Sequence, residues 1–168
     1  MNDKELKQKT NDACYALMKE TGIITAVDVL MAIGVLSKTD YERWRRGDRV
    51  DYLERVCKIN LKKLSTMNRE IRTFAKKNDL KASWTFYRQW SKLDKNGKAK
   101  SKNKAKHQGQ GKPQSVKLRF SKSGDEGVER QYATHYISQK TIDEIKERRL
   151  QAENANIDAT SAETTEQI

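Results

Sequence analysis

The sequence contains only two cysteines and one proline, and it has no long apolar run. Cys14 and Cys57 are too few for the disulfide framework of a small secreted domain. No apolar run approaches the roughly 18 residues that a membrane-spanning helix needs. The first residues, MNDKELKQKT, are charged from the third position and so lack the apolar centre of a signal peptide. We therefore expect a cytoplasmic protein with reduced cysteines and no membrane association.

Residues that carry catalytic chemistry are also sparse. His107 and His135 are far apart in the sequence and far from either cysteine, so no zinc-ligand spacing is present. The chain has no phosphate-binding glycine loop, nucleophile elbow or dinucleotide fingerprint. We expect a non-enzymatic protein without a metal or other cofactor. A metal-dependent nuclease is a third alternative, and its carboxylates and lysine would come from this set: Asp125, Glu126, Glu129, Glu144, Lys146.

Positive charge is abundant and unevenly distributed, with 35 Lys and Arg against 23 Asp and Glu. Residues 91–115 contain eight lysines and one acidic residue. Because Leu93 is the only large aliphatic residue there, the segment cannot bury enough apolar surface to fold alone. We expect a flexible lysine-rich loop that attracts phosphates non-specifically, or alternatively a solubilising linker. Residues 151–168, with four acidic and no basic side chains, are expected to be a disordered acidic tail.

Helix signals recur through residues 1–81, which we expect to form a helical domain. Four polar residues followed three positions later by an acidic residue act as helix starts, and glycines 22, 34 and 47 act as stops. A fifth helix, to about residue 78, has apolar residues spaced along one face. The expected helices follow Asn2, Thr25, Ser37, Asp51 and Asn60.

Residues 82–150 are expected to form a β-hairpin-like element and a C-terminal helix, interrupted by the loop 91–115. Apolar and polar residues alternate over 83–90 and again over 116–121, which indicates two strands. Since these strands flank the loop, we expect them to pair antiparallel. Residues 128–138 fit a helix or a third strand, with the helix favoured, and Thr141 begins a last helix. The predicted fold class is mainly α with a small antiparallel β element, an α+β fold.

Two groups of cations on predicted helices are candidate nucleic-acid contacts. The helices on either side of Gly34 have the outline of a helix-turn-helix, although Asp40 stands where an apolar packing residue is expected. Four cations on the fifth helix lie within about 80° of arc, opposite its apolar face, and would favour an anionic partner. Ordinary solvated faces are the alternative in both cases. The candidates are Arg43, Arg45 and Arg46 on the first group, and Lys62, Arg69, Arg72 and Lys76 on the second.

A third candidate is the predicted strand pair, where aromatic residues alternate with cations. Rings that stack on bases beside cations that hold phosphates suit single-stranded nucleic acid. We expect Trp84 and Phe86 in the core and Tyr87 and Trp90 at the surface. The accompanying cations are Arg88, Lys117 and Arg119.

Two segments, DYERWRRGDRVDYLERV at 40–56 and KLRFSKSGDEGVERQYATHY at 117–136, resemble segments of small bacterial proteins of unassigned function. The resemblance implies a bacterial cytoplasmic protein and brings no active site or ligand with it. Taken together, the residues predict a protein that binds DNA or RNA, associated with nucleoid or ribosome. The alternative is a protein–protein interaction module whose apolar contact is Trp44, Trp90 or the pair Tyr132 and Tyr136. The oligomeric state stays open.

Overall fold

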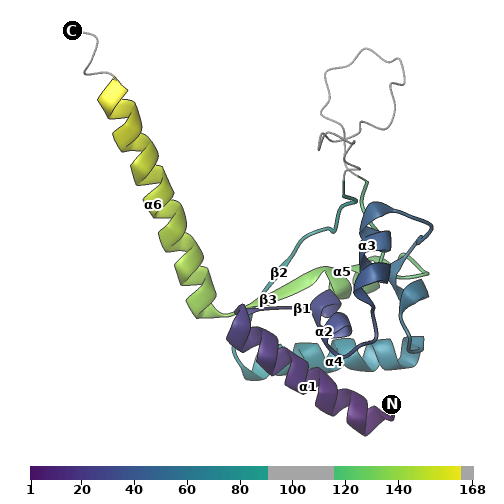
Figure 1. Cartoon of the computed structure of the whole chain (residues 1–168). Helices are drawn as coiled ribbons and strands as arrows, with labels where there is room; N and C mark the ends of the chain where they lie inside the picture. Colours follow the sequence, from purple (N-terminus) through teal and green to yellow (C-terminus); the bar gives the residue numbers. More distant parts are fainter. Residues whose placement is uncertain (91–115, 164–168) are drawn as a thin grey trace, which may run out of the picture.

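The computed structural model describes residues 1–90 and 116–163, so the predicted lysine-rich loop 91–115 lies outside the described residues. Helices and a small sheet alternate along the chain, which confirms the predicted α+β fold (Figure 1). The helices are α1 (Asp3–Glu20), α2 (Ala26–Ala32), α3 (Lys38–Arg46), α4 (Leu61–Lys77), α5 (Glu126–Ala133) and α6 (Gln139–Glu163), with a 3₁₀ turn η1 (Leu53–Val56). The strands are β1 (Ile23–Thr25), β2 (Lys81–Trp84) and β3 (Thr134–Ile137).

The sheet is antiparallel, with β3 between β1 and β2. Tyr136 of β3 lies opposite Ile24 of β1 and Ala82 of β2, and Thr134 lies opposite Trp84. The segment 128–138 therefore forms both predicted structures in turn, a helix and then the central strand. The β-branched and aromatic residues 134–137 suit this strand, and its two neighbours satisfy its backbone on both sides.

The predicted hairpin between residues 83–90 and 116–121 is wrong for most of its length. The strand β2 pairs with β3 and not with residues 116–121. The two segments that flank the loop do meet antiparallel at Arg88 and Lys117, where Leu118 N donates to Tyr87 O and Gln89 N donates to Val116 O, both at 2.8 Å. Residues 116–121 form only isolated bridges, the second one joining Tyr52 to Arg119. This extended segment is held between two parts of the chain without a continuous ladder.

Two helix predictions also need correction. The helix expected after Asp51 is a single 3₁₀ turn, and no side chain caps it. The expected disordered tail is helical as far as Glu163, because α6 continues without interruption. Residues 139–163 contain neither glycine nor proline and include several alanines and glutamates, which favour helix over coil. α6 points away from the rest of the chain (Figure 1).

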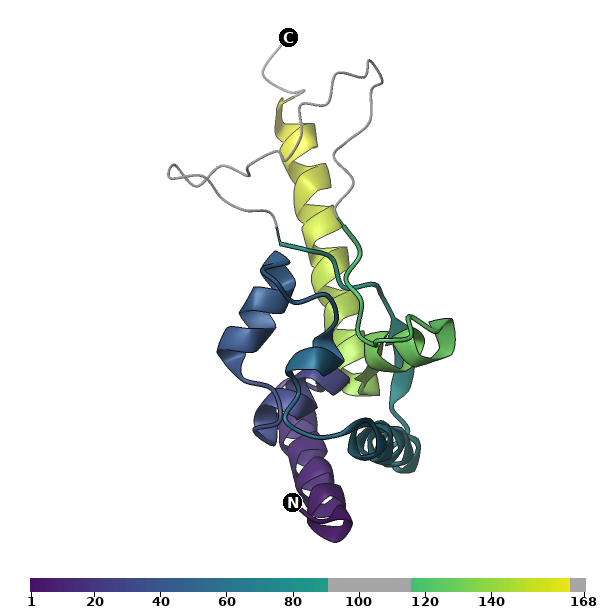
Figure 2. The ribbon, with the colours of Figure 1, turned by 90° about the vertical axis from the view of Figure 1, so that its right-hand side faces the viewer.

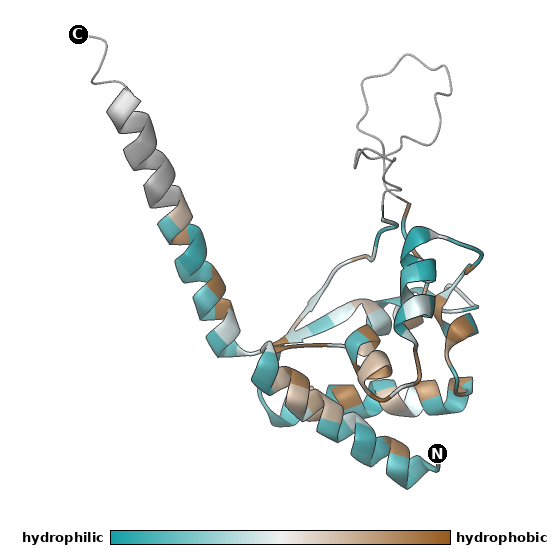
Figure 3. Cartoon of the chain, in the orientation of Figure 1, coloured by the Kyte–Doolittle hydropathy of each residue, from teal (hydrophilic) through white to brown (hydrophobic). Residues whose placement is uncertain are grey.

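The core has an aliphatic part and an aromatic part. The aliphatic part lies between α1, α4, α2 and β1, and the buried residues of α1 and α4 are mostly apolar. Hydrophobic and hydrophilic residues follow one another along these helices (Figure 3). The aromatic part centres on Trp44, which is fully buried and donates from Nε1 to Arg119 O at 2.9 Å. Phe120 stacks on Tyr132 with ring centroids 5.4 Å apart. This cluster joins α3 and α5 to the chain segments on either side of residues 91–115.

Candidate nucleic-acid interface

The predicted cationic face of α4 exists as an exposed surface. Asn60 caps the helix by accepting a hydrogen bond from Lys63 N at 3.0 Å, and one face is buried against α1. The opposite face carries Lys62, Arg69, Arg72 and Lys76, all exposed. Among the described residues none of the four forms an ion pair. Glu70, the acid of this helix, pairs instead with Lys7 of α1 at 3.7 Å. We call these four side chains the α4 basic face.

The α4 basic face is followed along the chain by the sheet, since α4 ends at Lys77 and β2 begins at Lys81. Burial raises the pKa of Tyr136, and the positive charge of Arg72 acts in the opposite direction. Tyr136 and Trp84 point to the same side of the sheet, since Tyr136 is opposite Ala82 and Trp84 lies two residues further along β2. The strand that follows the cationic helix therefore carries an exposed aromatic residue at its end.

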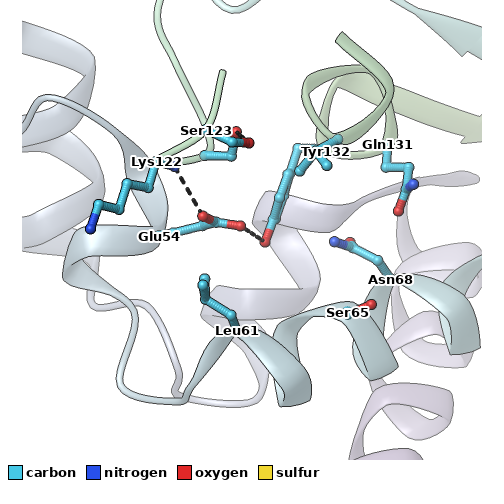
Figure 4. Close-up of a pocket in the computed structure, with 10 residues that line it drawn as sticks. Glu54, Leu61, Ser65, Asn68, Lys122, Ser123, Gln131 and Tyr132 are labelled. Carbon is cyan, nitrogen blue, oxygen red and sulfur yellow. Dashed lines mark hydrogen bonds between the residues drawn. The ribbon is translucent and has the colours of Figure 1, made fainter. Parts of the chain in front are cut away.

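A cavity of about 560 Å³ lies beside the α4 basic face, between α4, α5 and the turn at 121–123 (Figure 4). Ser65 and Asn68 line it from α4, and Asn68 is one helical turn from Arg72. Glu54 lies in it and accepts hydrogen bonds from the Tyr132 hydroxyl at 3.0 Å and from Lys122 N at 3.2 Å. Burial, and secondarily the charge of Glu54, raise the pKa of Tyr132, so this hydroxyl keeps its proton. These contacts fix the walls of the cavity.

The arginines of α3 are engaged within the fold. Arg43 pairs with Asp40 at 3.5 Å and Arg46 pairs with Glu42 at 2.8 Å. Arg45 stacks on Tyr87 and Trp90, with its Cζ 5.1 and 5.0 Å from the ring centroids. The backbone carbonyl of Arg45 accepts a hydrogen bond from Trp90 N at 2.7 Å, so residues 87–90 cover the end of α3. α3 also lies away from α4 in both views (Figures 1 and 2), so the two predicted groups of cations do not form one surface.

The predicted burial of the aromatic residues in 84–90 is wrong at three positions, Trp84, Phe86 and Tyr87. Tyr87 packs against Trp44 and Phe120, with ring centroids 5.7 and 5.2 Å away, and burial raises its pKa to about 12. Trp84 and Phe86, expected in the core, are 45% and 41% exposed. The reason is that β2 ends at Trp84, so residues 85–90 leave the sheet and the alternation no longer assigns sides. Trp90 is exposed as predicted.

The three cations predicted beside these rings have different environments. Arg88 and Lys117 are exposed and face each other across the antiparallel bridge. Arg119 donates from Nη2 to the carbonyls of Lys122 at 2.7 Å and Ser121 at 3.3 Å, so it holds the turn that follows. Sequence reasoning missed Arg130 of α5, whose Cζ lies 4.7 Å from the centroid of the Trp84 ring. No local pattern could reveal this contact, because it joins residues far apart in the chain.

Several side chains of types that can act in catalysis are buried or hydrogen-bonded inside the fold. Glu129, a carboxylate of the nuclease alternative, is buried and accepts hydrogen bonds from Phe120 N and from Ser121. Among the residues that the structure describes, no three His, Cys, Asp or Glu side chains lie close enough to hold a metal ion. Burial raises the pKa of the Cys14 and Cys57 thiols to about 12, which keeps them protonated and poorly nucleophilic near neutral pH.

Comparison with protein-family models, curated protein sequences and solved structures gives no match to this chain. Within residues 1–90 and 116–163, no helix has both the length and the apolar character needed to cross a membrane.

Proposed function

We propose that the protein is a non-enzymatic nucleic-acid-binding protein that contacts the phosphate backbone through the α4 basic face. The observation that carries the proposal is the exposure of four cations on one side of α4 without an ion pair to any described residue. Cations held close together without acids repel one another, and a polyanion relieves that repulsion. The lysines of residues 91–115 would add sequence-independent attraction to phosphates.

The length of the α4 basic face suits an extended polyanion. From residue 62 to residue 76 the helix rises about 21 Å, over which one strand of a duplex carries about six phosphates. The buried side of α4 packs on α1, so the four cations are presented by a fixed helix. Arginine forks that contact phosphates position a nucleic acid without reading its sequence, and we expect affinity for many sequences.

A fluorescence-anisotropy titration tests the proposal with labelled duplex DNA, single-stranded DNA and single-stranded RNA. We expect Arg69→Glu with Arg72→Glu to weaken binding at least tenfold and to leave thermal unfolding nearly unchanged, because both side chains are exposed. The matched control is Arg148→Glu with Arg149→Glu, two exposed arginines of α6 with the same change in charge. It should weaken binding less than threefold. Equal losses in the two variants would reject the α4 basic face, and a wild-type protein that binds none of the ligands would reject the function.

The second candidate function is a protein-interaction module, and the burial of its candidate contact residues limits which of them can touch a partner. Trp44 and Tyr132 are buried in the core and cannot contact a partner. Trp90 is 39% exposed and remains available. A pull-down from lysate separates the two candidates: partners that persist after nuclease treatment and disappear with Trp90→Ala would favour the interaction module.

A further inference from the structure

Trp84 and Phe86 form an exposed aromatic pair at the end of β2. Their ring centroids are 5.1 Å apart and their planes nearly perpendicular. Trp84 and Phe86 are each more than two-fifths exposed, although the fold buries Trp44, Tyr132 and Phe120 completely or almost completely. The two neighbouring side chains form a contiguous apolar surface, and such surfaces are candidates for binding sites.

Cations lie on both rings. The Nζ of Lys117 is 3.5 Å from the centroid of the Phe86 ring, and the guanidinium of Arg130 lies over Trp84. These cations come from two segments, 116–121 and α5, that are remote from β2 in the sequence. The tertiary fold therefore gathers two rings and two positive charges in one place, which we call the Trp84 patch: Trp84, Phe86, Lys117 and Arg130.

A hollow of about 250 Å³ opens within the Trp84 patch. Besides the four patch residues, Gly124, Glu126 and Glu129 line it. The carboxylate of Glu129 accepts hydrogen bonds from the backbone of Phe120 and Ser121, so both of its oxygens already have donors. Glu126 is the remaining acid of the lining and belongs to the first turn of α5, where the helix dipole favours it. The hollow thus offers ring surfaces and two cations beside two carboxylates, a chemistry that suits a flat aromatic ring more than a free anion.

The α4 basic face leads along the chain into the strand that carries the Trp84 patch. α4 ends at Lys77 and β2 runs from Lys81 to Trp84, so Lys76 lies shortly before the start of this strand. A nucleic-acid strand whose phosphates lie along α4 can therefore continue along β2 to the two rings. The α3 arginines provide no such continuation, since α3 lies away from α4 in both views (Figures 1 and 2).

We propose that the Trp84 patch stacks unpaired bases of a single-stranded nucleic acid whose phosphates are held by Lys117, Arg130 and the α4 basic face. This inference rests on the proposed function and assigns its substrate class. Every base has a π face, so stacking on Trp84 and Phe86 binds single strands without strict sequence preference. The bases of a duplex already stack on one another and are not available to these rings. The patch therefore selects single strands over duplexes.

The test measures the affinity of the full chain for a single-stranded oligonucleotide and for a duplex of the same length. We expect Trp84→Leu with Phe86→Leu to weaken single-strand binding at least tenfold and duplex binding less than twofold. Trp84→Phe retains an aromatic face and should stay within threefold of the wild type. Tyr15→Leu, which removes an exposed aromatic residue of α1, is the matched control and should change neither affinity.

A spectroscopic measurement keeps the inference testable if the leucine variant does not fold. Stacking of a base on Trp84 should quench part of the tryptophan fluorescence of the wild type on addition of the single strand, and that part should be missing in Trp84→Phe. Identical quenching in both proteins would overturn stacking at Trp84. So would unchanged single-strand affinity in a folded leucine variant, which would point to a protein partner for the exposed rings.

The two proposals fail in different ways. If Arg69→Glu with Arg72→Glu loses both ligands while the leucine variant keeps its single-strand affinity, only the stacking site is rejected. If the wild type binds neither ligand, the proposed function is rejected and the stacking site with it. Equal losses on single strand and duplex in the leucine variant would reject selection of single strands.

Discussion

The carboxylate of Glu129 accepts hydrogen bonds from both the backbone N–H and the hydroxyl of Ser121, at 2.8 and 2.7 Å. Its second oxygen accepts from Phe120 N at 2.9 Å. One buried side chain of α5 thereby satisfies two backbone donors of the extended segment 116–121. The same segment carries Phe120 into the aromatic core and Lys117 onto Phe86, so Glu129 positions both the core and the Trp84 patch.

We predict that Glu129→Gln lowers the free energy of unfolding by about 2 kcal/mol, because buried donors lose a charged acceptor. Glu144→Gln is the matched control: Glu144 is exposed and lies 3.9 Å from Lys140, and its loss should cost less than about 0.5 kcal/mol. Urea unfolding followed by circular dichroism measures both values. Equal small effects would mean that the Glu129 hydrogen bonds contribute little to stability.

Gly22 and Gly34 allow a second prediction, because both have positive φ, +68° and +74°, but only Gly22 is crowded. A Cβ at Gly34 would meet nothing within 4 Å, so Gly34→Ala should cost only the backbone strain, about 1–2 kcal/mol. A Cβ at Gly22 would collide with the Thr141 hydroxyl, which bonds to Ser138 at the start of α6. Gly22→Ala should therefore cost more than Gly34→Ala in urea unfolding.

The collision can be separated from the backbone strain. Adding Thr141→Ala to Gly22→Ala removes the hydroxyl and should recover part of the lost stability, whereas the same addition to Gly34→Ala should lower stability further. If the two glycine variants are equally stable, the packing of Gly22 against α6 does not contribute.

The helix starts were predictable from sequence because they depend on neighbouring residues. Asn2, Thr25, Ser37 and Asn60 each accept a hydrogen bond from the N–H three residues later, as their spacing indicates. The α4 basic face was predictable for the same reason, since a helical wheel needs only the local sequence. That its four side chains are exposed follows from the burial of the opposite face on α1.

The sheet and the Trp84 patch could not be predicted in this way. β3 pairs with strands that lie at least 50 residues earlier in the chain, and no local pattern specifies these partners. The burial of Tyr87 and the exposure of Trp84 depend on where β2 ends and on which segment supplies Phe120 and Arg130. The alternation of apolar and polar residues over 83–90 assigned them to two sides of a strand, but it did not show which side faces the core. It also did not show that the strand ends at Trp84.

His135 gives a prediction for pH dependence. Burial lowers its pKa below the usual 6.5, and the charge of Asp28 opposes this only in part. Its ring lies against Tyr87, and its Nε2 has no hydrogen-bond partner among the described residues. The folded state thus binds this proton less readily than the unfolded state, so the stability is fully present above about pH 6.5 and is lost as the pH falls through that value toward the folded pKa.

We expect the urea midpoint of the wild type to fall between pH 7.5 and pH 5 more steeply than that of His135→Gln. His107→Gln is the control for loss of a histidine as such, and it should keep the wild-type slope. A His135→Gln variant with the wild-type slope would assign the pH dependence to carboxylates instead.

Salt dependence distinguishes the α4 basic face from the arginines of α3. Each neutralised phosphate contributes about 0.7 to the slope of log K against log salt on single strands and about 0.9 on duplexes. If Arg69 and Arg72 contact phosphates, Arg69→Gln with Arg72→Gln should reduce the slope by about 1.4 on single strands. Arg43→Gln with Arg46→Gln removes the same charge, but these side chains are already paired with Asp40 and Glu42. That variant should reduce the slope by less than about 0.5. The opposite ranking would mean that α3 leaves its acidic partners to meet the phosphates, as a helix-turn-helix recognition helix does, and that the α4 basic face is only solvated.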